Sequence, residues 1–142
     1  MICEFRFAIR ATHDGTGNDD PTKKFLLRIM KLVGALPKTV QGSAISNQLI
    51  HSGTSVAANY RAACRVRSKR EFIAKLGTVE KEADESAFWL ELIIEGRLLP
   101  EKLITPLLEE SSELVAIAAA SKKTALSRLF RLQIANRKSQ IS

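Results

Sequence analysis

Residues 68–96 decide the fold of this chain, and they read SKREFIAKLGTVEKEADESAFWLELIIEG. Their apolar side chains recur every three or four positions, which is the period of a helix. The residues of this stripe are Phe72, Leu76, Val79, Ala83, Ala87, Leu90 and Ile94. Ser68 followed by Glu71 is typical of a capping box, and we expect Gly96 to be the C′ glycine at the other end. The stretch therefore predicts one long helix whose stripe resembles a coiled-coil seam.

Three other segments have the same period. The first covers residues 22–36, the second covers 43–63, and the third begins at Pro100 or, if Thr105 is its cap, at Pro106. No stretch of useful length alternates as a strand does. The sequence therefore predicts an all-α fold, an antiparallel up-and-down four-helix bundle with short links.

The expected helix starts follow from residues whose side chains cap helices. Asp19, Asp20 or Thr22 is the expected cap of the first helix. Ser43 is the expected cap of the second helix, after a break over residues 39–42. Gly53, inside the second helix, costs about 1 kcal/mol relative to alanine, so we expect close packing of a neighbouring helix to offset that cost.

We expect three parts along the chain. Residues 1–21 contain a run of Gly, Asn, Asp and Pro and are predicted to be a loosely ordered leader. Residues 22–126 are predicted to form the bundle, and residues 127–142 a basic C-terminal extension. The helical period persists after Ser121, so this end is either a continuation of the fourth helix or an arm that orders on a partner.

Composition excludes several classes of protein. The chain has 142 residues with 45% hydrophobic content, which suits one domain with its own core. Its two cysteines, Cys3 and Cys64, are too few for a disulfide framework or a zinc finger. We find no signal peptide and no apolar run near the length of a membrane span, about 20 residues. These features predict a cytoplasmic protein with no membrane partner.

Charge is distributed in blocks. Lys and Arg number 22 and Asp and Glu 15, which gives a net charge of +7. Residues 1–70 carry +8, residues 71–113 carry −7 and residues 114–142 carry +6. Such blocks are either complementary helix faces within one fold or a functional basic surface.

No catalytic constellation is visible. The Glu-x-x-His pairs of di-iron bundles are absent, and so are P-loop and dinucleotide fingerprints. Carboxylates around Glu80 and Asp84 either hold a divalent cation or form an ordinary solvated face, which we favour. His51 is expected to make a polar contact in helix packing, and Cys64 to be a small packing residue. We therefore expect no enzyme, no cofactor and no metal site.

Basic side chains are the strongest functional candidates, because they can neutralise phosphates. Arg61, Arg65, Lys69 and Arg70 recur at about one turn and form a ridge if the helix continues through them. The first helix carries a second patch and the C-terminal segment a third. The candidates in these two patches are Lys24, Arg28, Lys31, Lys122 and Lys123. Phe88 and Trp89 are adjacent and cannot share one core stripe, so we expect Trp89 at a subunit interface.

Three blocks in order carry a resemblance to a known family: residues 48–63, 68–76 and 80–92. They resemble the four-helix-bundle proteins encoded by intervening sequences of bacterial 23S ribosomal RNA genes, the S23 ribosomal protein family. The resemblance implies assembly as a homopentamer, a basic surface that binds nucleic acid, and no catalytic residue. A similar fold belongs to the accessory protein of diversity-generating retroelements, which pairs with a reverse transcriptase and RNA.

The chain departs from this family pattern at two positions. His51 stands where the family commonly has Arg, and Gly53 where it commonly has Ala. The first change weakens any basic groove along the second helix. The sequence thus predicts a non-enzymatic homo-oligomer that binds RNA or DNA through basic ridges. The alternative is an interaction scaffold, an accessory subunit that docks a partner enzyme.

Overall fold

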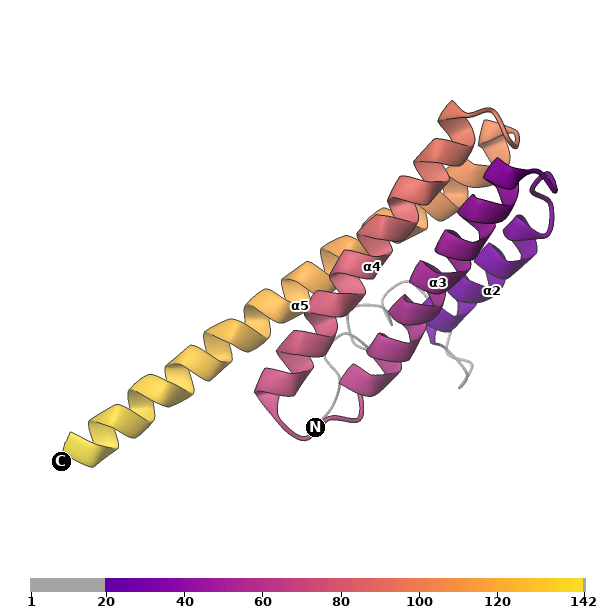
Figure 1. Ribbon diagram of the computed structural model, residues 1–142. Coiled ribbons are helices and arrows are strands. Elements are labelled where there is room, and N and C mark those ends of the chain that lie inside the picture. The colour runs from indigo at the N-terminus through magenta and orange to yellow at the C-terminus, as the bar shows by residue number, and fades with distance from the viewer. Residues whose placement is uncertain (1–19, 142) are drawn as a thin grey trace.

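The computed structural model describes residues 20–141, which form four helices and no strand (Figure 1). The helices are α2 (Pro21–Val33), α3 (Val40–Ala63), α4 (Lys69–Glu95) and α5 (Glu101–Ile141). Consecutive helices are antiparallel and in contact, and α2 also contacts α5, which closes the bundle. The predicted all-α four-helix fold is confirmed for this part of the chain. The expected leader lies almost wholly outside the described residues.

Large side chains from all four helices fill the core. Among those with no exposed surface are Phe25, Leu49, Leu76, Leu90 and Ile104. Their regular spacing along each helix explains why one stripe per helix suffices to build a continuous apolar interior.

The middle of the core is polar and narrow. The hydroxyls of Ser52 on α3 and Ser86 on α4 are fully buried and hydrogen-bond to each other at 2.8 Å. Each hydroxyl oxygen also lies within hydrogen-bond distance of a carbonyl oxygen of its own helix, that of Leu49 or Glu82, so the two hydroxyl hydrogens can serve two of these three contacts. Both serines are therefore satisfied, and their small size lets α3 and α4 approach closely.

Gly53 confirms the expected close approach of α2 and α3. A Cβ atom at this position would lie 2.8 Å from Cδ1 of Ile29 and 3.4 Å from Cδ1 of Leu26. The absence of a side chain on α3 therefore allows the fully buried Ile29 of α2 to pack against the α3 backbone.

The predicted start of α3 is wrong by several residues. The helix begins at Val40, with Thr39 as its N-cap, instead of following a break capped by Ser43. The Thr39 hydroxyl accepts a hydrogen bond from the Gly42 amide at 3.1 Å. Gly42 lets the first turn of α3 lie close to the backbone of Pro37, because a Cβ atom at position 42 would lie 1.9 Å from the Pro37 carbonyl oxygen.

The other helix ends agree in part with the sequence. Asp20, one of three candidates, caps α2, and the Ser68 hydroxyl accepts from the Glu71 amide at 3.1 Å. At the end of α4 the prediction is wrong: Gly96 is the C-cap with φ −78°, and Arg97 takes the left-handed C′ position with φ 54°. The Arg97 amide bonds to Ile94 and the Leu98 amide to Ile93, which is a Schellman motif.

Helix α5 starts at Glu101 and includes Pro106, so the earlier of its two predicted starts is correct. It then continues without interruption to Ile141, across the proposed boundary at residue 126. Figure 1 shows that α5 leaves α4 and protrudes well beyond the bundle. Of the two possibilities for the C-terminal segment, the structure has a continuing helix.

Candidate nucleic-acid interface

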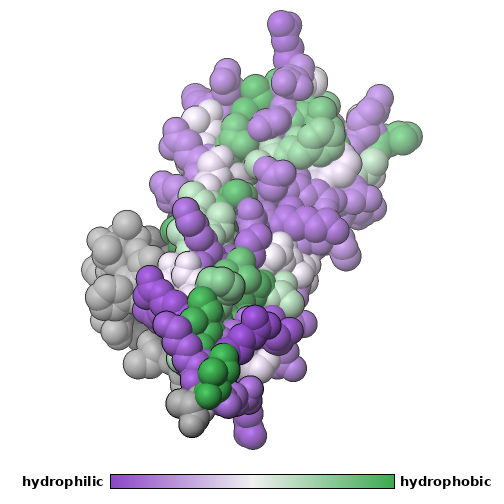
Figure 2. Space-filling model, turned by 90° about the vertical axis from the view of Figure 1, so that its left-hand side faces the viewer, coloured by the Kyte–Doolittle hydropathy of each residue, from purple (hydrophilic) through white to green (hydrophobic). Residues whose placement is uncertain are grey.

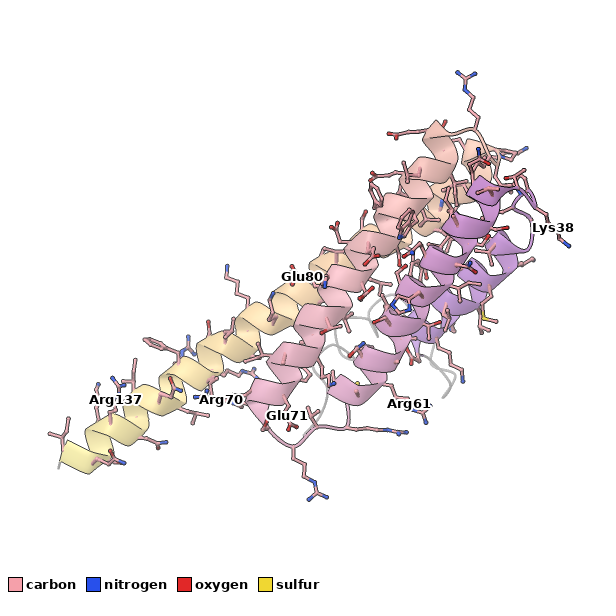
Figure 3. The ribbon with its side chains drawn as sticks, in the orientation of Figure 1. Lys38, Arg61, Arg70, Glu71, Glu80 and Arg137 are labelled. Atoms are coloured by element: carbon pink, nitrogen blue, oxygen red, sulfur yellow. The ribbon has the colours of Figure 1, made fainter. Side chains whose placement is uncertain are left out.

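The up-and-down topology brings basic residues from two helices and the turn between them to one end of the bundle. The end of α3 and the start of α4 meet there, because consecutive helices are antiparallel, whereas the shorter α2 begins partway along α3 (Figure 1). We call this surface the basic end and define it as Arg61, Arg65, Arg67, Lys69 and Arg70. Lys24, at the start of α2, lies away from this end. Figure 3 shows Arg61 and Arg70 at this end, whereas Lys38 lies at the opposite end.

The expected single ridge from Arg61 to Arg70 does not exist. Helix α3 ends at Ala63, and the Cys64 and Arg65 amides bond to the carbonyls of Tyr60 and Ala62 in its last turn. The chain then reverses before Ser68 caps α4. The four candidate residues therefore gather around a turn instead of lying along one helix face.

Most of the basic end is open to solvent. Arg61, Arg65, Arg67 and Arg70 are exposed, and Lys69 is half-buried. The nearest acidic side chain in sequence is Glu71, in the first turn of α4. These features favour contact with a polyanion.

The remaining candidates do not join the basic end. Arg28 Nη1 lies 2.7 Å from Glu110 Oε2, and Lys122 Nζ lies 2.7 Å from Glu80 Oε2. Lys31 is in the last turn of α2, near the opposite end. Arg28 and Lys122 thus balance carboxylates on α5 and α4, as expected of complementary helix faces.

Lys122 and Lys123 also lie too far along the bundle to belong to the basic end. Glu80, the partner of Lys122, is eleven residues from the start of α4, which corresponds to about 16 Å. These two lysines form a separate site on the flank of α5.

The two adjacent aromatic residues of α4 differ in exposure. Trp89, the expected interface residue, is half-buried and packs against the core, and its Nε1 is buried with no hydrogen-bond partner. Phe88 is 50% exposed, and the two rings meet edge to face with centroids 5.0 Å apart. The sequence indicated that one of these two residues lies off the core stripe and favoured Trp89, whereas the structure exposes Phe88 more.

Within residues 20–141, no three or more His, Cys, Asp or Glu side chains gather in a way that could hold a metal ion. His51 is exposed, so the expected packing contact is wrong. Cys64 is half-buried against the core. No described helix is both long and apolar enough to span a membrane.

Comparisons with a family model and with solved structures both found similar proteins. The family model described as 23S rRNA-intervening sequence protein matches residues 21–120. The crystal structure of a protein with unknown function from the S23 ribosomal protein family of Bacteroides thetaiotaomicron VPI-5482 is similar, with a TM-score of 0.67 and 31% identity. That match covers 73% of this chain and 96% of the other. No curated protein matches the sequence.

Proposed function

The chain belongs to the 23S rRNA-intervening sequence protein family, and from this premise we propose that it is a cytoplasmic, non-enzymatic homo-oligomer that binds RNA. The proposed contact is the basic end of the bundle. The observation that carries the proposal is the gathering of four exposed arginines and Lys69 around the turn between α3 and α4.

The chemistry of this surface fits phosphate groups better than bases. Arginine forms paired hydrogen bonds to phosphate oxygens, and both arginine and lysine release counterions from a nucleic-acid backbone. Aromatic side chains on which bases could stack do not occur among the residues of the basic end. The proposed ligand is therefore a structured RNA held by its backbone, with affinity that falls steeply as salt increases.

Assembly would strengthen such binding. We propose the homopentamer that the family resemblance implies, with one basic end contributed by each subunit. Several weak contacts held at fixed spacing raise the overall affinity by effective concentration, provided that one RNA can reach more than one of them.

A charge-reversal pair tests the RNA proposal. Arg61→Glu with Arg65→Glu changes the basic end, and Lys31→Glu with Lys38→Glu makes the same change in net charge near the opposite end. Fluorescence anisotropy with a labelled RNA hairpin gives the affinity between about 50 and 200 mM salt. The slope of the logarithm of the association constant against the logarithm of the salt concentration should become less negative by about 0.7 to 0.9 for each phosphate contact removed.

The basic-end variant should bind at least tenfold more weakly than the control variant at the lower salt concentration. Equal affinity of the two variants, or wild-type binding that persists at about 0.5 M salt, would overturn the proposal. The alternative, an accessory subunit that docks a partner enzyme, predicts that both variants bind RNA as the wild type does.

A further inference from the structure

The end of α5 carries an apolar stripe that its own bundle does not cover. We call residues 126–141 the arm. Leu126, Phe130 and Ile134 follow one another at intervals of four residues, with exposures of 48%, 64% and 39%. Leu126, Phe130 and Ile134 lie about 100°, 140° and 180° around the helix from the buried Ala125. The stripe is therefore not an extension of the core-facing stripe of α5.

The arm is also strongly basic. Arg128, Arg131, Arg137 and Lys138 lie within it, and no acidic residue follows Glu113 in the chain. Figure 2 views the molecule from the side on which the arm projects, and shows a row of hydrophobic residues flanked by hydrophilic ones. The surface that would cover this stripe must therefore combine apolar area with negative charge.

Helix α4 presents such a surface on its outer side. Phe88 is half-exposed, and carboxylates lie three, four and seven residues from it on neighbouring helical positions. These carboxylates are Asp84, Glu85, Glu91 and Glu95, which together with Phe88 we call the acidic face of α4. Its length from Asp84 to Glu95 is about 16 Å, and the arm is about 24 Å long, so the arm can span the whole face.

The arm cannot reach the acidic face of its own chain. The ion pair between Lys122 and Glu80 marks one level at which antiparallel α5 and α4 lie side by side. Phe88 is eight residues beyond Glu80 in one direction, and Ile134 is twelve residues beyond Lys122 in the other, which separates them by about 30 Å. Because α5 is continuous, the arm cannot fold back.

We propose that the arm docks on the acidic face of α4 in a second copy of this chain. The apolar stripe would cover Phe88, and the basic side chains of the arm would pair with the surrounding carboxylates. Such a contact joins two different surfaces, so it repeats from copy to copy around a ring or along a filament. On the arm side it lies outside residues 21–120, the part of the chain that the family model matches.

This contact rests on the self-assembly part of the proposed function and is independent of RNA binding. The test uses the full chain, treated with nuclease, and measures its mass by light scattering at about 50 mM salt. Arg131→Glu with Lys138→Glu reverses the charge at two positions of the arm. Asp84→Lys with Glu91→Lys reverses the charge at two positions of the acidic face. All four residues are exposed, so the bundle should remain folded, and circular dichroism checks that it does.

Each double variant should lose half or more of the wild-type mass, because its arm and its neighbour's face then carry the same sign. The chain with all four substitutions should recover the wild-type mass, since the charges are again complementary. Lys31→Glu with Lys38→Glu is the control for net charge and should keep the wild-type mass.

An arm variant with unchanged mass, or a fourfold variant that does not recover, would overturn the contact and leave self-assembly intact. A monomeric wild type would overturn both, while the RNA titration would still decide the proposed ligand. Loss of RNA binding, or of binding to phosphatidylserine vesicles, in an arm variant of unchanged mass would assign the arm to those surfaces and refute its docking on a second copy.

Discussion

Replacing Gly42 by alanine should destabilise the protein strongly, although alanine is the better helix former. The added Cβ would lie 1.9 Å from the oxygen and 3.0 Å from the carbon of the Pro37 carbonyl. Both of these atoms belong to the backbone, so no side-chain rotation relieves the clash. The turn between α2 and α3 must therefore move by more than 1 Å, since ordinary contact begins at about 3.4 Å.

Two lost interactions determine how much stability the Gly42→Ala substitution costs. The Thr39 hydroxyl would lose its hydrogen bond to the Gly42 amide, and N-caps contribute about 0.5–2 kcal/mol. Displacement of the turn also disturbs Leu36, which is only 6% exposed, and overpacking of this kind costs about 1–3 kcal/mol. Together these losses lower the free energy of unfolding by about 1.5–5 kcal/mol.

Gly77 provides the matched control. It lies inside α4, and a Cβ atom there would meet nothing within 4 Å. Alanine at this position should stabilise the protein by about 1 kcal/mol, because only the helix propensity changes. Urea unfolding followed by circular dichroism at one fixed protein concentration gives both values. A Gly42→Ala variant within about 0.5 kcal/mol of the wild type would refute the reasoning.

Three further substitutions test the core, a cap and an ion pair by the same unfolding measurement. Leu90→Ala should cost about 2–5 kcal/mol, since Leu90 is fully buried, and a loss below 1 kcal/mol would contradict that packing. Ser68→Ala removes the acceptor of the Glu71 amide and should cost about 0.5–2 kcal/mol; no change would mean that the cap is dispensable. Glu80→Gln breaks the pair with Lys122 and should cost less than about 1 kcal/mol, with a smaller effect at 1 M salt than at low salt.

The helices and the family could be predicted from the sequence because their signals are local. Apolar residues at helical spacing indicated where each helix lies, and three sequence blocks indicated the family that the comparison then confirmed. Helix ends were less certain, because several residues in a row can act as caps. At Thr39 and Arg97 the outcome depended on backbone contacts, with Pro37 in one case and with Ile93 and Ile94 in the other.

The candidate site was also predicted only in part. The sequence identified Arg61, Arg65, Lys69 and Arg70 as a group, but it assumed one continuous helix. The turn after Ala63 instead gathers them at one end of the bundle. Lys122 and Arg28 turned out to balance carboxylates that are 42 and 82 residues away along the chain.

By itself, the sequence determined that residues 20–141 form four helices, which face of each helix is apolar, and which segments are basic or acidic. These properties depend on residue type and on spacing within one helix. Only the tertiary structure decided which basic segments meet, that Phe88 is exposed beside a half-buried Trp89, and that the end of α5 protrudes with its apolar stripe uncovered. The reason is that exposure depends on which neighbouring helices cover a face, and residues distant in sequence supply that cover.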